Sequence, residues 1–505
     1  MVTPALKQDS NSVGLAWAEE TSIGVLPGGP FFYSLDPNGF ADFGGSIKTV
    51  ARRPINLSRQ KKKGTTVDLD ASGGFGIDLT QDNVQELLQG FFFADMRRKA
   101  ELAIASVKQA GGDEDYEPAA GGTAFYAKDL LWAKGFSDAG NNGLKVVVSS
   151  GAASVIVTTA LTKAAVQTGT ISRVGHEFAA GDCSVDVSGT YPKLVTIAKD
   201  LTQLGVIPGE WVYIGGDAAL ENFAVAGNNG YARVRSVVIH AMEFDKTQGV
   251  MLIDNGGVKT IRIYLGRVLK NESGTSIVRR SYQLERQLGA PDTSAPGDIQ
   301  AEYLIGAIPN EMTLNIPSAD KVTLDMSFVG IGVEQVLGSA GPKTATRPTL
   351  ADSDAFNTSS DFSRIKMSVC GSATALFAFL TDMKITLKNN IVPNKAVGTL
   401  GAFDCSAGTF DVAGSVTAYF ADIAAVAAVW GNSDITLDFM LAKANHGIAI
   451  DIPMICLGDG RPKVDIDKPI TLPLTLDAAS GAKALATQDH TLLMVFFDYL
   501  PTVAC

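Results

Sequence analysis

Strict alternation of apolar and polar residues marks much of this 505-residue chain, and it predicts strands with one buried face. The clearest examples are residues 311–316 and 321–328, which the short segment 317–320 connects. A short connection between two alternating runs is typical of a hairpin. The pattern therefore predicts a mainly β fold.

One strand-then-helix pattern occurs twice in the chain. The first copy starts at Asp70 and the second at Asp411, and each has a glycine three residues later, followed by a period-2 apolar run. A second aspartate, Asp82 or Asp422, then precedes an apolar run that suits a helix, and its carboxylate is a plausible N-cap. The same β unit is thus built twice, which suits a protein that assembles with copies of itself.

The composition of the chain changes between these two copies. An acidic, glycine-rich stretch suggests a boundary, and the region after it alternates Val-, Thr- and Ile-rich runs with Asn-Gly pairs, which are typical of hairpin turns. Within that region the sequence Gly-Asn-Asn-Gly occurs at 140–143 and 227–230, each time before an alternating strand. We therefore predict a main domain in two parts (1–100 and 271–505), a linker (101–122) and an inserted β-rich domain (123–270).

The charge balance narrows the possible functions. A formal net charge of −11 argues against a protein that grips nucleic acid through its phosphates, which would need a basic surface. It suits a surface past which a polyanion slides, although most acidic proteins are simply soluble. With 52 glycines, 46% apolar and 19% charged residues, the chain fits a folded, soluble, β-rich class.

Cysteine usage and the termini indicate a protein made inside a cell. The cysteines are odd in number, far apart and form no CxxC pair, so neither a disulfide framework nor a zinc site is expected. No basic-then-apolar signal opens the chain, and the most membrane-like run, 423–430, is far too short to span a bilayer. We expect no membrane partner. The cysteines are Cys183, Cys370, Cys405, Cys456 and Cys505.

No catalytic or metal-binding motif is evident. His176-Glu177 lacks the second histidine of a zinc protease, and the glycine-rich run at 330–335 lacks the third glycine of a dinucleotide loop. Neither a P-loop nor a GxSxG nucleophile elbow occurs. Asp113 and Asp115 favour a solvated loop over calcium binding or acid–base chemistry. We therefore expect no enzyme, no cofactor and no metal.

Four segments, in this order, resemble the tail tube proteins of bacteriophages with long, non-contractile tails (siphovirus type). Each segment is a β pattern with common turn residues, and together they extend over both parts of the predicted main domain. The inserted region carries no motif of the tube core. The segments are 18–27; 67–79 with 83–90; 281–286 with 301–316; and 380–390 with 414–420 and 448–453.

The resemblance implies a tail-tube β-sandwich or barrel with a flanking α-helix, carrying the inserted β-rich domain. It implies rings, usually hexameric, that stack into a hollow tube and deliver genomic DNA to the host. The partners it implies are further copies of the chain and the tape measure, tail terminator and tail tip proteins, with DNA passing through unbound. The location it implies is the tail of the virion, after synthesis in the host cytoplasm.

A duct for DNA needs an acidic or neutral lining, because rings of Lys or Arg would trap phosphates. Polar positions of the alternating strands are therefore the candidate lumen-facing residues. An ordinary solvated sheet face is the alternative interpretation. The candidates are Asp78, Thr313, Asn315, Thr323 and Asp325.

A basic stretch without any acidic residue runs from Arg52 to Lys63. It could face DNA, or it could be a solvated charge run. We favour an exposed loop that meets an acidic patch on the next ring. The candidate ring-stacking residues are Arg59, Lys61, Lys62 and Lys63.

Two other functions remain open on sequence grounds. A β-rich tail-tip component or adhesin that binds a host surface would form discrete particles rather than open-ended tubes. A hydrolase on a β scaffold is disfavoured by the missing motifs. In the tube interpretation, the inserted modules project outward, because an insertion tolerated by a closed ring must leave the lumen and the stacking faces clear.

Overall fold

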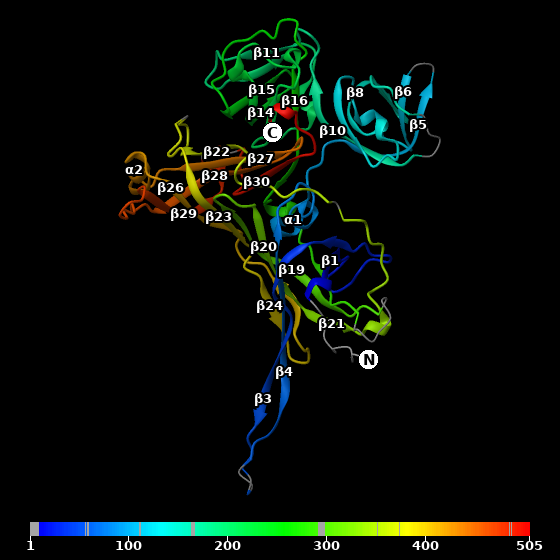
Figure 1. The fold of residues 1–505 in the computed structure, drawn as a ribbon, viewed down its shortest axis with the longest axis vertical. Helices are drawn as coiled ribbons and strands as arrows, with labels where there is room; N and C mark the ends of the chain where they lie inside the picture. Colours follow the sequence, from blue (N-terminus) through cyan, green and yellow to red (C-terminus); the bar gives the residue numbers. More distant parts are fainter. Residues whose placement is uncertain are drawn as a thin grey trace.

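The chain folds into two large β-sheets, and the prediction of a mainly β fold is confirmed (Figure 1). The larger sheet has 16 strands and the second has 12, while a separate hairpin has two. Two short α-helices accompany them within the described residues. The computed structural model describes residues 10–55, 57, 60–110, 113–162, 167–290, 298–350, 352–372, 374–483, 485 and 487–504.

Eight strands of the larger sheet lie side by side, each antiparallel to its neighbours, and we call them the long sheet. They come from both parts of the predicted main domain, so this domain is assembled from segments far apart in the sequence. In spatial order the long sheet is β3 (Pro37–Arg52), β4 (Lys62–Asp78), β20 (Thr323–Gly330), β19 (Ala301–Pro317), β23 (Leu380–Lys388), β26 (Asp411–Tyr419), β29 (Thr471–Ala479) and β28 (His446–Asp459).

The remaining strands of the larger sheet extend from β19 and from β28. One hydrophobic core joins these additional strands to the apolar face of the long sheet, and it includes Trp17, Phe75, Leu314 and Phe439. On the β19 side the additional strands are β1 (Gly14–Glu19), β2 (Tyr33–Leu35), β18 (Tyr282–Gln287) and β21 (Gly332–Val336). On the β28 side they are β17 (Arg267–Lys270), β22 (Phe362–Val369), β27 (Ile435–Lys443) and β30 (Leu493–Phe497).

The two predicted helices are present, but only one uses its predicted cap. In α1 (Gln85–Phe92) the side chain of Asp82 does not cap the first turn, because the helix starts later, with Val84 at the N-cap position. Ahead of α2 (Ala424–Trp430), Asp422 Oδ1 does accept a bond from the backbone N–H of Ala424 at 3.1 Å. Burial of an apolar face holds α1 in place instead, since Leu87, Leu88 and Phe91 are fully buried.

The stretch predicted as a linker, 101–122, forms two paired strands, so this prediction is wrong. They are β5 (Glu101–Ala110) and β6 (Asp113–Pro118). The acidic residues misled the sequence interpretation, because they alternate with inward-facing residues such as Ile104, Val107 and Tyr116, which are buried. Alternation, rather than total charge, decides whether a segment becomes a strand.

Strands β5 and β6 belong to a closed six-stranded barrel. Its order is β10-β5-β6-β9-β8-β7, and β7 pairs back with β10. Closure leaves no free strand edge in this part of the second sheet. The other members are β7 (Asp129–Lys134), β8 (Gly143–Gly151), β9 (Ser154–Val157) and β10 (Gly169–Glu177).

A second module of the same sheet continues from β10. It packs around its own hydrophobic core, which includes Phe178, Val212, Phe244 and Ile263. Its strands are β11 (Cys183–Asp186), β12 (Lys193–Thr196), β13 (Trp211–Ile214), β14 (Gly230–Val238), β15 (Ala241–Thr247) and β16 (Arg262–Tyr264).

The prediction that the two Gly-Asn-Asn-Gly motifs form hairpin turns is wrong. In both motifs a buried asparagine instead bonds to the backbone of a residue distant in sequence. Each contains a short 3₁₀-helix, and its first asparagine, Asn141 or Asn228, is fully buried. The amide of Asn141 bonds the backbone N–H and C=O of Thr162 at 2.7 and 2.8 Å. The amide of Asn228 bonds those of Leu252 at 2.8 and 3.0 Å. A buried asparagine that satisfies a distant backbone thus fixes each module.

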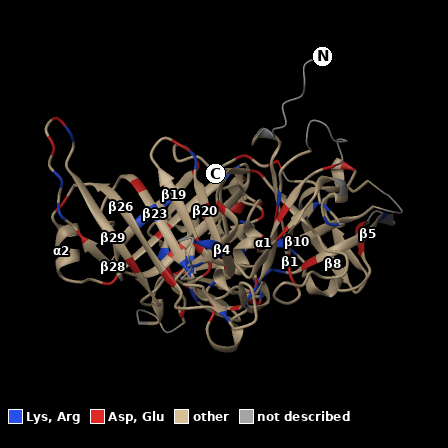
Figure 2. Cartoon of the chain, turned by 90° about the horizontal axis from the view of Figure 1, so that it is seen from below, with Lys and Arg blue, Asp and Glu red and all other residues tan. Residues whose placement is uncertain are grey.

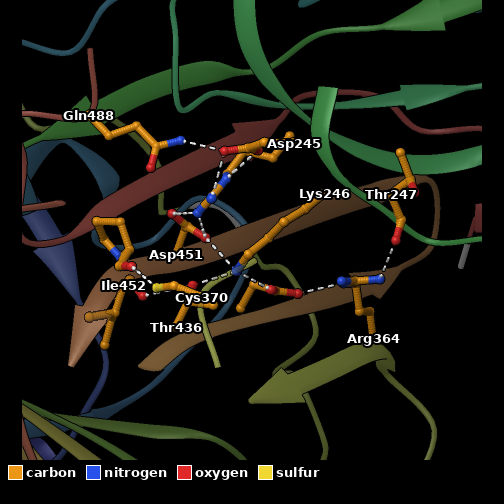
Figure 3. Close-up of polar contacts among 12 residues, drawn as sticks. Asp245, Lys246, Thr247, Arg364, Cys370, Thr436, Asp451, Ile452 and Gln488 are labelled. Carbon is orange, nitrogen blue, oxygen red and sulfur yellow. Dashed lines mark hydrogen bonds and ion pairs between the residues drawn. The ribbon is translucent and has the colours of Figure 1, made fainter. Parts of the chain in front are cut away.

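A cluster of charged residues, which we call the ionic junction, fastens the second sheet to the larger one (Figure 3). Arg233 lies between two aspartates, with Nη2 2.8 Å from Asp245 Oδ2 and Nη1 3.0 Å from Asp451 Oδ2. Its six members carry three positive and three negative charges. Arg233, Asp245 and Lys246 come from β14 and β15, whereas Arg364, Asp438 and Asp451 come from β22, β27 and β28.

Asp438 receives two cations from opposite sides. Lys246 Nζ lies 2.7 Å from its Oδ1 and Arg364 Nε 2.5 Å from its Oδ2. Burial opposes ionisation of Asp438, but Lys246 and Arg364 outweigh it and hold its pKa below the usual value. Burial also lowers the pKa of Lys246 and raises that of Asp451. The balance of charges is therefore essential, since a buried ion that loses its partner is strongly destabilising.

We predict that Lys246→Met destabilises the folded chain by about 3–5 kcal/mol, because Asp438 and Asp451 lose a shared cation where both are fully buried. Chemical denaturation gives the free energy of unfolding. The matched control is Lys193→Met in the same sheet, where the solvent-screened pair with Asp186 should contribute little to stability. Equal losses in the two variants would contradict a special role for the junction.

Candidate assembly surfaces

The five predicted lumen residues lie on one face of the long sheet, where three adjacent strands bring them together. Asp78 of β4 is opposite Thr323 of β20, which is opposite Asn315 of β19. One pleat further along, Asp325 of β20 is opposite Thr313 of β19. Because side chains two residues apart share a face, all five project from the same side.

Hydrogen bonds and an ion pair join these residues to one another and to their neighbours. Asn315 Nδ2 donates to Asp325 Oδ2 at 2.8 Å, and Lys321 Nζ lies 2.6 Å from Asp78 Oδ2. The hydroxyls of Thr313 and Thr386 are 3.1 Å apart. Thr313 is only 5% exposed, whereas Asp325 is exposed. The five side chains therefore differ in their access to a molecule inside a tube.

The same polar face continues across β23, β26 and β29, and its charges are mostly acidic. Lys384 is opposite Asn315 and Ser415, and Lys388 is opposite Glu311 and Asp411, with an ion pair of 3.2 Å between Lys388 and Glu311. Figure 2 shows both signs of charge along these strands. Where β4 and β20 to β29 pair with one another, six acids stand against these two lysines and Lys321: Asp78, Glu311, Asp325, Asp382, Asp411 and Asp477.

The opposite face of the long sheet is the hydrophobic core. Across one row of strands, Ile77, Leu324, Leu314 and Ile385 are each no more than 4% exposed. One face is therefore permanently covered by the chain itself. Of the two faces of the long sheet, the polar one is left open to other molecules.

Three of the four candidate stacking residues lie at the tip of the hairpin that β3 and β4 form. This hairpin extends well beyond the body of the molecule (Figure 1). Lys61, Lys62 and Lys63 are exposed there, while Arg59 lies outside the described residues. Arg52 is directly opposite Lys62. Because like charges opposite each other weaken a strand pair, this tip is suited to an acidic partner.

The other end of the long sheet is rich in aspartate. The antiparallel strands place the end of β4, the turn from β19 to β20, the start of β23 and the end of β26 at this same end. We call it the acidic end. It also carries Lys321, which pairs with Asp78. Its exposed acids are Asp82, Asp320, Asp382 and Asp422.

Sequence reasoning missed the ionic junction and the acidic end, because their members are scattered along the chain. The only available signal was the duplicated unit, which placed β4 and β26 in equivalent roles but gave no pairing between them. Strand pairing alone brings Asp78, Asp382 and Asp422 to one end of a sheet.

Elsewhere in the part of the chain that the structure describes, titratable groups do not form an evident reaction centre. His176 Nδ1 lies 2.9 Å from Asp129 Oδ1, and burial lowers the pKa of this histidine. Burial likewise lowers the pKa of His490 to about 3. Among the described residues, no three His, Cys, Asp or Glu side chains are grouped to hold a metal ion. Nor does this part of the chain contain a helix long and apolar enough to cross a membrane.

Comparison with known proteins adds a family to this geometry. The family model described as phage tail tube protein matches residues 10–478, which is nearly the whole chain and includes both parts of the long sheet. No curated protein matches the sequence. The matched range carries the polar face, the β3–β4 hairpin and the duplicated unit. The chain therefore belongs to the phage tail tube protein family, whose members are structural components of the virion.

Proposed function

We propose that copies of this chain form rings that stack into the hollow tube of a long, non-contractile phage tail. The polar face of the long sheet lines the lumen, and viral DNA passes through it on the way to the host. The observation that carries this proposal is an eight-stranded sheet with one buried apolar face and one mostly acidic polar face. Such a lining repels phosphates rather than binding them.

Ring formation follows from the edges of the long sheet. A sheet with free edges can add strands from another chain, and closure into a ring satisfies those edges. The resemblance implies that such rings are usually hexameric. The tape measure, tail terminator and tail tip proteins are the further partners of the proposal, and host cytoplasm is the proposed site of synthesis.

Stacking uses the two unlike ends of the long sheet. The basic tip of the β3–β4 hairpin on one ring meets the acidic end of the next ring. A contact between unlike surfaces repeats without closing, so it produces an open-ended stack. Opposite charges also guide the rings into the correct polarity. The hairpin projects far enough from the body to serve this contact (Figure 1).

The inserted β modules, proposed at 123–270, project from the outside of the tube together with the strands β5 and β6 before them, whereas β17 at the end of this range pairs with β30 in the larger sheet. Their attachment is rigid, because the ionic junction and a shared apolar cluster bind them to the larger sheet. Trp211, Tyr231 and Tyr264 of the second sheet pack there with Val495 and Phe497. A rigid attachment keeps the modules away from the lumen and from the stacking contacts.

Negative-stain electron microscopy of the purified protein over a concentration series tests this function. We expect rings with a central pore at low concentration and hollow tubes at high concentration. Compact monomers or small closed particles at every concentration, also in the presence of phage initiator complexes, would contradict the tube and favour the adhesin alternative.

We predict that the triple variant Lys61→Glu, Lys62→Glu, Lys63→Glu folds normally but shortens the tubes at least severalfold, because the reversed tip repels the acidic end. Tube lengths in micrographs and sedimentation profiles give the readout. The charge-matched control Lys134→Glu, Lys193→Glu, Lys259→Glu changes the second sheet by the same net charge and should leave tube length unaltered.

A charge swap sharpens this prediction. Adding Asp320→Lys, Asp382→Lys and Asp422→Lys to the triple variant should restore tube length in part, since attraction between the two ends returns with reversed sign. The aspartate substitutions alone should shorten tubes as the lysine substitutions do. Unchanged tube length in all of these variants would remove the proposed stacking contact.

We predict that tubes of the double variant Asp325→Lys, Asp477→Lys retain DNA. Both side chains lie exposed on the polar face, so the introduced lysines can bind phosphates. Tubes assembled around duplex DNA should release it for the natural sequence and retain it for the variant at low salt. Retention should fall steeply as salt rises, as phosphate contacts require. Asp186→Lys with Glu243→Lys in the second sheet is the control and should retain none.

A further inference from the structure

The larger sheet contains the same supersecondary unit twice, in far more detail than the short sequence motif reveals. The first unit runs β1, β3, β4, α1, β18, β19, β20, β21, and the second runs β22, β23, β26, α2, β27, β28, β29, β30. Without β2, β17 and the separate hairpin at Val392–Lys395 and Ala402–Ser406, which have no counterparts, both units have seven strands and one helix in the same chain order. The second sheet lies between α1 and β18 of the first unit.

Strand pairing repeats element by element. In the first unit β18 pairs with β1 and β19, β19 with β20 and β21, and β4 with β20 and β3. In the second unit β27 pairs with β22 and β28, β28 with β29 and β30, and β26 with β29 and β23. The two units therefore have one topology.

The register repeats as well. Gly73 of β4 is opposite Phe328 of β20, and the equivalent Gly414 of β26 is opposite Leu476 of β29. Each unit contributes four strands to the long sheet in matching order: β3-β4-β20-β19 and then β23-β26-β29-β28. The long sheet is thus two consecutive copies of one four-stranded element.

The two copies meet at a seam inside the chain, where β19 pairs with β23. Residues Glu311–Pro317 of β19 run antiparallel to Asp382–Lys388 of β23, with Glu311 opposite Lys388. Backbone hydrogen bonds continue from one unit into the next across this seam. The seam therefore shows how the outermost strand of one four-stranded element, β19, pairs with the outermost strand of the next, β23.

The two outer strands of the long sheet, β3 and β28, are the counterparts of β23 and β19, the two strands that meet at the seam. β3 is the equivalent of β23, and among the described strands it pairs only with β4. Among the described strands, the final residues of β28, Cys456–Asp459, pair with β29 alone, because β27 pairs with β28 only as far as Ile455 and β30 only as far as Asp451. An edge of each kind thus remains, one at each end of the chain's own pair of units.

We infer that β3 of one copy pairs with the end of β28 of the next copy, in the manner of the internal seam, and that three copies close the ring. The inference rests on the proposed function, which supplies the ring. By the repeated registers, Ser46 of β3 takes the place of Lys388 and Gly458 of β28 that of Glu311. A ring of three chains then contains six of the supersecondary units, because each chain contributes two.

The width of the resulting barrel supports three chains rather than six. Strands lie about 4.8 Å apart and tilt by roughly 40° in barrels, so three chains of eight strands close at a backbone diameter of about 50 Å. Side chains on the inside narrow this to about 40 Å, a channel for a single DNA duplex. Six chains would roughly double the diameter and leave a lumen far wider than one duplex needs.

The rotational symmetry of the tube is the first test. End-on electron micrographs should show three outer lobes per ring, one for each inserted region, and the mass of an isolated ring should be three times 53.0 kDa. Six lobes, or a ring of six chain masses, would overturn the inference and leave the proposed tube intact. Absence of any ring or tube would instead overturn the proposed function, and this inference with it.

Cross-linking tests the seam itself. The exposed Cys456 of β28 lies two residues before Gly458, so Ser46→Cys in β3 should be joined to Cys456 of the next copy by a short bismaleimide. We expect denaturing gels to show one, two and three chain masses and nothing larger. The variant Ser46→Cys with Cys456→Ser should lose this ladder, and Ser149→Cys on the barrel should not produce it.

A ladder that continues to six chains would overturn the three-chain ring while keeping the seam. Rings that assemble normally but give no cross-link through Ser46→Cys would overturn the pairing of β3 with β28. Both outcomes leave tube formation itself intact, which separates them from a failure of the proposed function.

Discussion

An exposed strand edge is the constraint on which the rest of this structure depends. Its backbone N–H and C=O groups need partners, and unpaired edges lead to uncontrolled association. The barrel of the second sheet removes its edges by closing on itself through β7 and β10. The long sheet does not close within one chain. It has an edge at β3 and another at the end of β28, so a closed structure requires further copies.

The two faces of the long sheet differ in polarity, and this difference decides which face is covered by the chain itself. Its apolar face is sealed by β1, β18, β22, β27 and the two helices in one continuous core. Its polar face carries more acids than lysines, and ion pairs such as Lys321–Asp78 and Lys388–Glu311 hold some of them in place. In the proposed tube, the covered core lies on the outside and the polar face lies on the inside, as a channel for DNA requires.

The second sheet shows how a large insertion is tolerated in such a subunit. It leaves the unit after α1 and returns before β18, so the pairing of the long sheet is undisturbed. The ionic junction attaches the second sheet to the larger sheet through charged residues from five different strands. Buried ion pairs contribute little net stability but penalise any other arrangement of the partners, and here they fix one orientation of the second sheet.

Much of the fold could be predicted from local patterns in the sequence, because alternation reports directly on burial along a strand. This applies to the strands containing Thr313 and Asp325, to the helix around Leu87 and Leu88, and to the duplicated unit. Local patterns misjudged 101–122, where acidic residues hid the alternation, and the Asn-Gly motifs, whose partners Thr162 and Leu252 are distant in sequence.

The sequence by itself determined that the chain is β-rich, that one unit occurs twice and which side chains alternate toward a polar face. Only the tertiary structure decided that the two units join through β19 and β23, that the acids at 78, 320, 382 and 422 gather at one end, and that Arg233 meets Asp451. The physical reason is that strand pairing uses backbone groups that every residue carries. Side chains therefore specify a strand and its buried face, while the choice of neighbour follows from packing of the whole core.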